Sequence, residues 1–271
     1  MYEEYWGLKE QAFGLTPDPR FLYRSQGHED VLTMLHHAVT RNKGAAVLWG
    51  DVGLGKTTIS RTLIQGLPAD HYSVVLIVNP ILTPTQIVQE ILHQIGVETT
   101  IKNRQALIQL LHESLLAEHA AGRHVVLMID EAHLVRSTAT LEELRLLLNW
   151  QMNDQFLISL VLIGQNELRP KLAKAPALES RLAIKCALSP LSAIETGEMV
   201  LHRMRVAGYS AENSPFTPDA VFQLHKASKG YPRIITTLAD QALIFGMAHK
   251  AQHIDGFMMH DTWRQFSGEA A

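Results

Sequence analysis

The chain has 271 residues, of which 46% are hydrophobic and 19% charged, and this composition excludes a mostly disordered protein. Its formal net charge is −3, whereas proteins that bind nucleic acid non-specifically usually carry a basic excess. Its single cysteine, Cys186, excludes an internal disulfide and fits a reducing compartment. The acidic, aromatic N-terminus is unlike a signal peptide, and no apolar run approaches the roughly 20 residues of a membrane span. We therefore expect a cytoplasmic protein with no membrane span.

Residues 1–27 are rich in aromatic residues, glycine and proline, and we predict an irregular segment there, followed by a helix over 28–41. Short apolar runs bounded by breakers then predict the buried strands of a parallel sheet. These runs cover residues 45–49, 74–78, 125–129, 156–163 and 183–188. Helical patterns alternate with them, at residues 57–67, 84–95, 103–121 and 141–152. Strands that alternate with helices predict an α/β core.

After residue 190 the strand signal stops. The patterns there predict helices over residues 192–207, 217–228, 232–250 and 261–266. The expected fold is therefore α/β: a five-stranded parallel sheet flanked by helices, followed by a small all-helical lid.

Residues 50–57, with the sequence GDVGLGKT, match the phosphate-binding pattern G-x-x-x-x-G-K-[ST] between a predicted strand and a predicted helix. The glycines let backbone N–H groups face a phosphate at the positive end of the following helix. Lys56 would neutralise the β- and γ-phosphates, and the Thr57 hydroxyl would bind Mg²⁺. The alternative is a glycine turn that precedes Lys-Thr by chance. The predicted nucleotide-binding residues are Gly50, Asp51, Val52, Gly53, Leu54, Gly55, Lys56, Thr57 and Thr58.

A second motif begins with the apolar run 125–129 and ends in Asp130 and Glu131. We predict that this strand lies beside the strand of the phosphate loop and that Asp130 holds a water of the Mg²⁺ shell. Glu131 is suited to polarise the water that attacks the γ-phosphate. On its own, the acidic pair could also be only a turn and a helix cap. The string Asp-Glu-Ala-His also occurs in helicases, but the chain has no room for a second motor domain.

With these motifs in view, the chain resembles the AAA+ ATPases of the ExeA/GspA type nearly from end to end. The resemblance is carried by YWGLKEQAFGL from Tyr5, PDPRFLY from Pro17, His28, GQNEL from Gly164, RMRVAG from Arg203, FTP from Phe216 and GYPR from Gly230. AAA+ regulators of DNA transposition share much of this pattern. The resemblance implies the AAA+ division of P-loop folds and ATP with Mg²⁺ as cofactors.

The resemblance also implies site residues. Gln165 would be sensor 1, which contacts the γ-phosphate, although Asn166 stands where the family often has proline, and either amide could act. Arg233 would be sensor 2, or it only begins a helix. The adenine would lie near residues 21–28, where His28 is either structural or a contact to the purine edge.

Arg181 falls where the family places its arginine finger, which acts on ATP held by the neighbouring subunit. The residue before it is Ser180 instead of the expected Gln, and the alternative is an arginine on a surface loop. The finger implies a homo-oligomer, either a ring of about six subunits or a filament.

The implied division is an N-terminal segment and helix over 1–43 that contributes to the nucleotide pocket, an ATPase core over 44–190 and a lid over 191–271. The implied function is the assembly or remodelling of a type IV (MSHA-like) pilus or type II secretion apparatus. Any such envelope role would act through protein partners, which would also bring the protein to the inner membrane.

The alternatives are a DNA-binding ATPase that regulates transposition and a nucleotide switch. Basic residues of the lid, among them Arg203 and Arg205, would be either a solvated helix surface or a contact to DNA. The spacing of the histidines does not predict a metal site beyond Mg²⁺.

Overall fold

The computed structural model describes residues 2–152 and 155–268. The chain divides into two compact units, which we describe separately. A sheet unit contains residues 28–51 and 59–188, and a helical unit contains the N-terminal segment up to Gly27, residues 52–58 and the chain from Ser189 onward. Residues 1 and 269–271, the two ends of the expected domain division, lie outside the described part.

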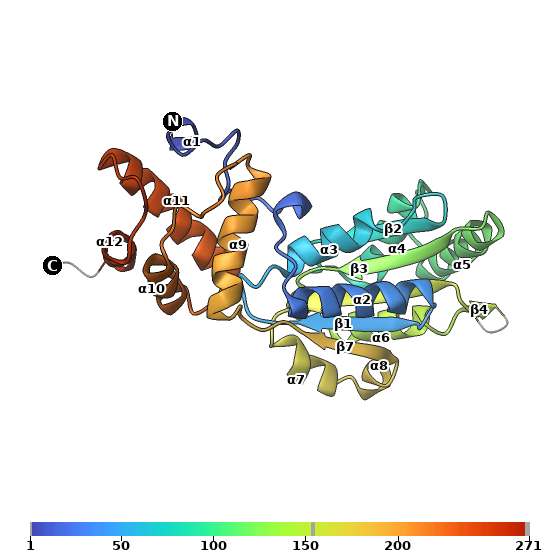
Figure 1. The fold of residues 1–271 in the computed structure, drawn as a ribbon. Coiled ribbons are helices and arrows are strands. Elements are labelled where there is room, and N and C mark those ends of the chain that lie inside the picture. Colours follow the sequence, from blue (N-terminus) through green and yellow to red (C-terminus); the bar gives the residue numbers. More distant parts are fainter. Residues whose placement is uncertain (1, 153–154, 269–271) are drawn as a thin grey trace. The chain divides into compact units, whose positions relative to one another are not determined.

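The sheet unit is built on five parallel strands: β1 (Ala45–Trp49), β2 (Tyr72–Ile77), β3 (His124–Ile129), β6 (Ile158–Gly164) and β7 (Leu182–Ala187). Their order across the sheet is β2-β3-β6-β1-β7, and Figure 1 labels all of these strands except β6. All five expected strands are present, and the predicted parallel sheet is confirmed. Because all the strands run in one direction, their carboxyl ends share one edge of the sheet, which is where ligands bind in open parallel sheets.

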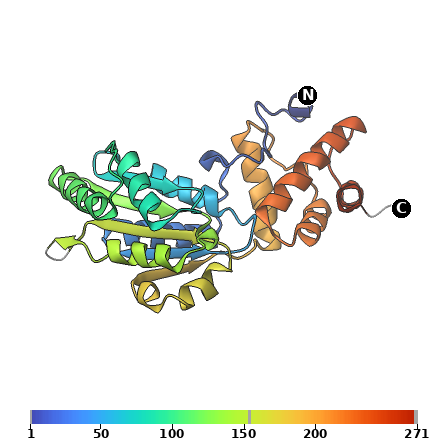
Figure 2. The same cartoon turned by 180° about the vertical axis from the view of Figure 1, so that it is seen from behind.

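Helices cover both faces of this sheet, as Figures 1 and 2 show. On one face lie α2 (Gln26–Thr40) and α3 (Lys56–Gln65). The other face carries α4 (Pro84–Gln94), α5 (Arg104–Ala120), α6 (Thr138–Leu147), α7 (Leu168–Ala173) and α8 (Pro176–Glu179). Alternate residues of β3, namely Val125, Leu127 and Ile129, are fully buried in the core with leucines of these helices. Strands covered on both faces explain why each one appears in the sequence as a continuous apolar run.

The segment between α6 and β6 differs from the prediction. The expected helix over 141–152 ends at Leu147, and residues 151–152 and 155–156 form the short antiparallel pair β4 (Gln151–Met152) and β5 (Gln155–Phe156). Phe156 therefore does not begin the long strand, which starts at Ile158. The Phe156 ring instead packs over Gly44, where a Cβ, if one were present, would lie 3.1 Å from the ring.

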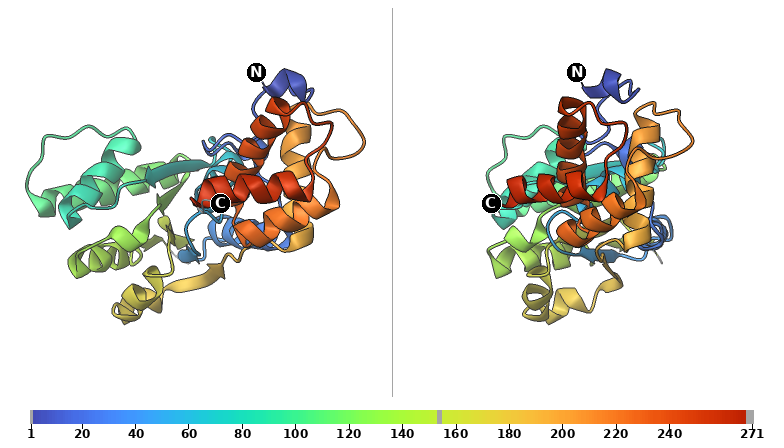
Figure 3. Two further views of the ribbon diagram at one scale, coloured as in Figure 1. Left: turned by 90° about the vertical axis from the view of Figure 1, so that its left-hand side faces the viewer. Right: turned by 60° about the vertical axis from the view of Figure 1, so that its left-hand side comes forward.

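The helical unit contains α9 (Ala193–Val206), α10 (Pro218–Ser228), α11 (Pro232–Ala248) and α12 (Gly256–Ser267), drawn in orange to red in Figure 3. The expected helical C-terminal part is confirmed, with a last helix longer than the predicted 261–266. Its core is apolar and includes the fully buried Leu224, Leu238 and Leu243.

The N-terminal segment packs on these C-terminal helices. It contains α1 (Tyr2–Tyr5) and the 3₁₀ turn η1 (Pro19–Phe21). The Trp6 indole N–H donates to the Leu243 carbonyl at 2.9 Å, and Tyr2, Trp6 and Phe13 are buried in the core of the helical unit. The aromatic residues of this segment therefore complete a core whose main helices begin only at Ala193.

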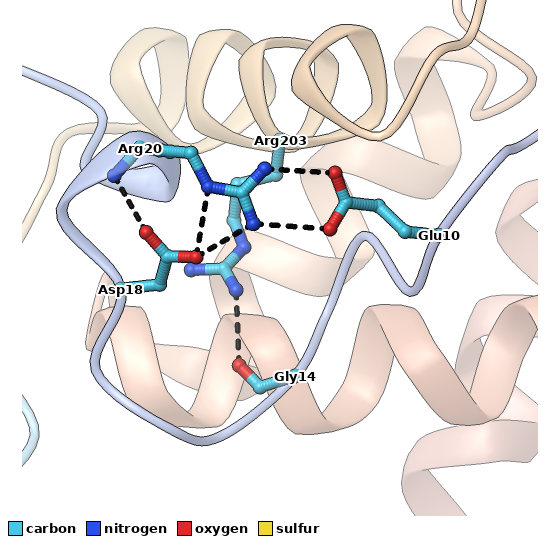
Figure 4. A network of polar contacts seen from close by, with 5 residues as sticks. All are labelled: Glu10, Gly14, Asp18, Arg20 and Arg203. Carbon is cyan, nitrogen blue, oxygen red and sulfur yellow. Dashed lines mark hydrogen bonds and ion pairs between the residues drawn. The ribbon is translucent and has the colours of Figure 1, made fainter.

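Arg203 of α9 lies at the centre of this packing (Figure 4). Its Nε donates to the Ala12 carbonyl at 2.9 Å and its Nη2 to the Gly14 carbonyl at 3.0 Å. Burial lowers the pKa of Arg203 to about 10, so the guanidinium is charged at neutral pH. Since Arg203 donates inward to backbone carbonyls, it does not form part of the basic surface that the sequence left open.

Candidate nucleotide-binding site

The phosphate loop begins where β1 ends, at Trp49, and α3 starts at Lys56. Between them, Gly53 and Gly55 have φ angles of 83° and 94°, values that favour glycine. Leu54 is buried, with 1% of its surface exposed, and anchors the loop, while Lys56 is also buried at 6%. A strand, a loop turned by two glycines and a helix N-terminus form the arrangement that binds phosphate groups through backbone N–H groups and the helix dipole.

Arg233, the second residue of α11, lies directly on this loop. Its backbone N–H donates to the Gly53 carbonyl at 3.1 Å, and a Cβ at position 53 would lie 2.9 Å from the Cβ of Arg233. Any side chain at position 53 would therefore displace Arg233. The two residues belong to the same compact unit, so the sequence motif GYPR and the phosphate loop come together.

Asp130 and Glu131 follow β3 at the carboxyl edge of the sheet. Asp130 is buried, with 4% exposed, and its backbone N–H donates to the Ile77 carbonyl at 2.9 Å. The Asp130 carboxylate accepts a hydrogen bond from the Glu131 N–H at 2.9 Å. Glu131 has a φ of 51°, which is uncommon outside glycine, and such backbone strain is found most often at functional sites.

The position of this acidic pair corrects one prediction. The strand β3 pairs with β2 and β6, so β6 lies between β3 and the phosphate-loop strand β1. Two strand spacings put about 10 Å between the ends of β1 and β3. The end of β6, with Gln165 and Asn166, fills the middle of this edge.

Gln165 and Asn166 make different contacts. The Asn166 side-chain N–H donates to the Asp51 carboxylate at 2.5 Å, and the Arg169 guanidinium lies 5.2 Å from the centre of the Trp49 ring. Both contacts tie the turn after β6 to the start of the phosphate loop. The Gln165 backbone N–H points the other way and approaches Nδ1 of His133 at 3.3 Å.

His133, which contacts Glu131, and Lys171, which contacts the His133 carbonyl, are residues near the acidic pair that were not predicted from the sequence. His133 lies in the 3₁₀ turn η2 (Ala132–Leu134), and its Nδ1 is 3.3 Å from Oε2 of Glu131. The Lys171 ammonium donates to the carbonyls of His133 and Val135, the latter at 2.8 Å, and burial lowers its pKa. The sequence offered one signal for His133, its place in the string Asp-Glu-Ala-His.

Arg181 lies at the opposite edge of the sheet. It directly precedes β7, and the register pairs Leu182 with Ala45, at the amino end of β1. Its guanidinium is exposed and donates to the Asn149 side-chain oxygen at 3.0 Å. Because β1 runs five residues before the loop begins, Arg181 is separated from Gly50 by roughly 15 Å of strand.

The remaining predicted residues are placed as follows. His28 is buried in the first turn of α2 with 3% exposed, Thr57 and Thr58 are partly buried in α3, and Val52 is 55% exposed. Hydroxyl and carboxylate oxygens such as those of Thr57 and Asp130 suit Mg²⁺, which prefers oxygen ligands and retains waters. Within residues 2–152 and 155–268, no group of three or more His, Cys, Asp or Glu side chains could hold a metal ion by itself. No helix of the described chain is long and apolar enough to cross a membrane.

Comparison with known proteins agrees with this geometry. The AAA domain family matches residues 39–172. The chain is 37% identical over 262 residues to the general secretion pathway protein A of Aeromonas hydrophila. That alignment covers 94% of this chain and 47% of the relative, so the chain spans about half the length of the curated relative it matches.

Solved structures share the fold at low sequence identity. The ORC2 protein of Aeropyrum pernix, in complexes with ADPNP and ADP, superposes with a TM-score of 0.69 at 15% identity, over 95% of this chain and 72% of that one. Drosophila ORC bound to DNA superposes with a TM-score of 0.71 at 17% identity, over 100% of this chain and 67% of that one. The RuvB Holliday junction branch migration motor of Thermotoga maritima superposes with a TM-score of 0.55 at 20% identity, over 89% of this chain and 69% of that one. Residues 39–172 thus match the AAA domain family, and the chain has the P-loop fold of the AAA ATPases.

Proposed function

We propose that this protein is a Mg²⁺-dependent ATPase that hydrolyses ATP between neighbouring subunits. The observation that carries the proposal is the edge of the sheet where three strands end in functional groups. The phosphate loop follows β1, the acidic pair follows β3, and Gln165 follows β6 between them. Phosphoryl transfer needs positioning and charge stabilisation more than covalent chemistry, and this edge supplies both kinds of group.

Each residue has a role that follows from its chemistry. The loop amides and the buried Lys56 bind the β- and γ-phosphates, and the N-terminus of α3 adds its positive dipole. Thr57 and Asp130 are the residues that would hold Mg²⁺, which neutralises phosphate charge when it is bound. Glu131, at the strand end, accepts a proton from the attacking water.

Three further residues belong to the proposed binding site. Arg233 contacts Gly53 through its backbone, which supports a role as sensor 2, with its guanidinium reaching the γ-phosphate. Gln165 is the better candidate for sensor 1, because the Asn166 amide is engaged with Asp51. For His28, the buried position at the start of α2 supports a structural role near the adenine.

Arg181 supports a homo-oligomer, a ring of about six subunits or a filament. It lies at the amino edge of the sheet, whereas the phosphate loop of the same chain leaves the carboxyl edge. An arginine that stabilises the transferring phosphoryl group has to contact it, so Arg181 can serve only the nucleotide of another subunit.

We further propose a role in type II secretion or in assembly of an MSHA-like type IV pilus, as in the MshM type of this family. The support is the 37% identity to the general secretion pathway protein A, over about half of that protein. Partners in the cell envelope and a place at the inner membrane belong to the same proposal. The residues 44–190 and 191–271 would act as its ATPase core and lid.

A transposition regulator is the alternative, and DNA binding separates the two. A regulator of that kind would be retained on duplex DNA when ATP is present, with affinity that falls steeply as salt rises. Arg203 binds backbone carbonyls of its own chain, so it is not available as one of the lid cations that would contact DNA in such a role.

The substitution Glu131→Gln tests the proposed reaction. The amide cannot take a proton from water, so we expect ATP hydrolysis to fall by about 100-fold or more while the Kd for Mg·ATP changes less than about threefold. Glu142→Gln is the matched control, because Glu142 is 52% exposed on α6 and pairs with Arg145. Hydrolysis that persists in Glu131→Gln would remove Glu131 from the reaction.

A further inference from the structure

His133 occupies a position between two groups that the ATPase reaction needs. Its Nδ1 is 3.3 Å from the Gln165 backbone nitrogen and 3.3 Å from Oε2 of Glu131. Its side chain is only 10% exposed, so water does not freely take the place of either neighbour. One ring nitrogen thus faces both the proposed base and the turn that carries the proposed sensor 1.

One nitrogen cannot serve both neighbours in the same state. To accept a hydrogen bond from the Gln165 N–H, Nδ1 must present its lone pair, which leaves the ring proton on Nε2. An unprotonated Nδ1 cannot donate to the Glu131 carboxylate. Oε2 of Glu131 is accordingly buried without a hydrogen-bond donor within the described residues.

The surrounding backbone fixes this arrangement. A Cβ at Gly164 would lie 3.2 Å from the His133 backbone nitrogen and 3.0 Å from a Leu168 methyl carbon, so glycine lets η2 approach the end of β6. Lys171 holds the carbonyls of His133 and Val135 from the far side of the turn. The backbone N–H of Leu134 donates to the Glu131 carbonyl at 2.8 Å, which closes the turn on the acidic residue.

We propose that His133 is a positioning residue for Glu131 and that it couples Glu131 to the Gln165 turn. While the Gln165 N–H occupies Nδ1, the imidazole packs beside the buried Oε2 without binding it, and the rest of the partly exposed carboxylate is left to accept a hydrogen from water. When the Gln165 turn moves away, Nδ1 can carry the ring proton in place of Nε2, donate to Oε2 and withdraw the base. The proton that leaves Nε2 is replaced by one that Nδ1 takes from water, so the change is an exchange of tautomers.

The inference rests on the proposed ATPase, but its first test needs no hydrolysis. Nitrogen-15 NMR of the histidine-labelled, nucleotide-free chain reports which ring nitrogen carries the proton, and the spectrum of His133→Ala identifies the His133 signals. We expect the tautomer protonated at Nε2, with Nδ1 as acceptor. A proton on Nδ1, in the neutral ring or in an imidazolium, would overturn the proposal whether or not the protein hydrolyses ATP.

Kinetics provide the second test. An Asn side chain can place an amide near the position of Nδ1, whereas the longer Gln side chain carries it beyond. For His133→Ala and His133→Gln we expect kcat to fall about tenfold with KM within twofold, and for His133→Asn a kcat within about threefold of the native value. His71→Ala, at a side chain 68% exposed, is the control and should leave kcat unchanged.

A double-mutant cycle separates positioning from general damage to the fold. If His133 acts through Glu131, then His133→Ala should have no further effect on the residual rate of Glu131→Gln. Independent, multiplying losses in the two variants would show that His133 acts elsewhere, and the proposal would fail. An inactive native protein with the expected Nε2 tautomer would instead count against the proposed ATPase alone.

Discussion

Gly53 and His133 show how contacts of single residues define this site. Arg233 approaches Gly53 so closely that even a methyl group at position 53 would collide with it. His133 similarly depends on the bare Cα of Gly164. Gly53 and Gly164 must lack a side chain because Arg233 and the His133 backbone, respectively, occupy the space that a Cβ would need.

His124 gives a prediction about pH at this scale. It lies at the start of β3, where its Nε2 is 2.8 Å from the Ser159 hydroxyl, and burial lowers its pKa from 6.5 to about 4. The folded state therefore disfavours the protonated ring. The stability that His124 contributes is fully present above pH 6.5 and is lost as the pH falls toward 4, by up to about 3 kcal/mol.

The variant His124→Gln cannot titrate and can still bond Ser159. We expect its free energy of unfolding, measured by urea denaturation, to change less between pH 7 and pH 4 than that of the native chain. His71→Gln is the control, because His71 is 68% exposed. Equal pH dependence in the native chain and His124→Gln would show that His124 is not a source of acid sensitivity.

At the scale of elements, two arginines fix the N-terminal segment (Figure 4): Arg20 bonds within the segment, and Arg203 of α9 bonds to it. Arg20 binds Glu10 through two hydrogen bonds of 3.0 and 3.1 Å and contacts Asp18 at 2.8 Å. Arg203 binds two backbone carbonyls and lies 5.2 Å from the Phe21 ring centre. The Arg20 contacts are exposed and join residues of the segment to one another, so of these two arginines it is Arg203 that attaches the segment to the C-terminal helices.

The substitution Arg203→Lys tests this attachment. Lysine keeps the charge but cannot reproduce the fixed pair of donors or the stacking on Phe21, so we expect a loss of about 1–3 kcal/mol in the free energy of unfolding. Arg205→Lys is a matched control at an exposed position of the same helix. If both variants unfolded at the native urea concentration, the Arg203 contacts would carry no net stability.

At the scale of the whole molecule, the proposed role of Arg181 predicts that ATPase activity depends on the association of subunits. A subunit alone lacks the arginine of its neighbour, so ATPase activity per subunit should rise with protein concentration. Arg181→Ala should abolish this rise and leave the Kd for ATP within about threefold. Lys174→Ala, at an exposed residue after α7, should behave like the native chain. Activity per subunit that stays constant down to nanomolar concentration would contradict an active oligomer.

The sequence could predict the features that are encoded locally. The phosphate loop, the acidic pair and the five strands each lie in one continuous stretch of residues, and all three were predicted from that stretch. The position of β6 between β1 and β3 depends on the order of strands in the sheet, which no single stretch encodes. For the same reason, a local pattern wrongly extended the helix over 141–152 past Leu147 and into β4, which pairs with β5.

Contacts between distant residues were also beyond the sequence. The bonds from Trp6 to Leu243 and from Arg203 to Ala12 join residues 237 and 191 positions apart. The aromatic residues of the N-terminal segment indicated that it packs against another part of the protein. They did not indicate that this part is the C-terminal helices. The roles of Gln165, Arg181 and Arg233 came from the family resemblance and remain predictions.

The most direct test of the account is the binding of Mg·ATP by the native chain and by Lys56→Ala, measured by isothermal titration calorimetry. The buried Lys56 is the main cation of the phosphate loop, so its loss should weaken binding by at least about tenfold and abolish turnover. We predict saturable binding of one ATP per chain to the native protein. Failure of the native protein to bind Mg·ATP, or native affinity and turnover in Lys56→Ala, would contradict the central claim.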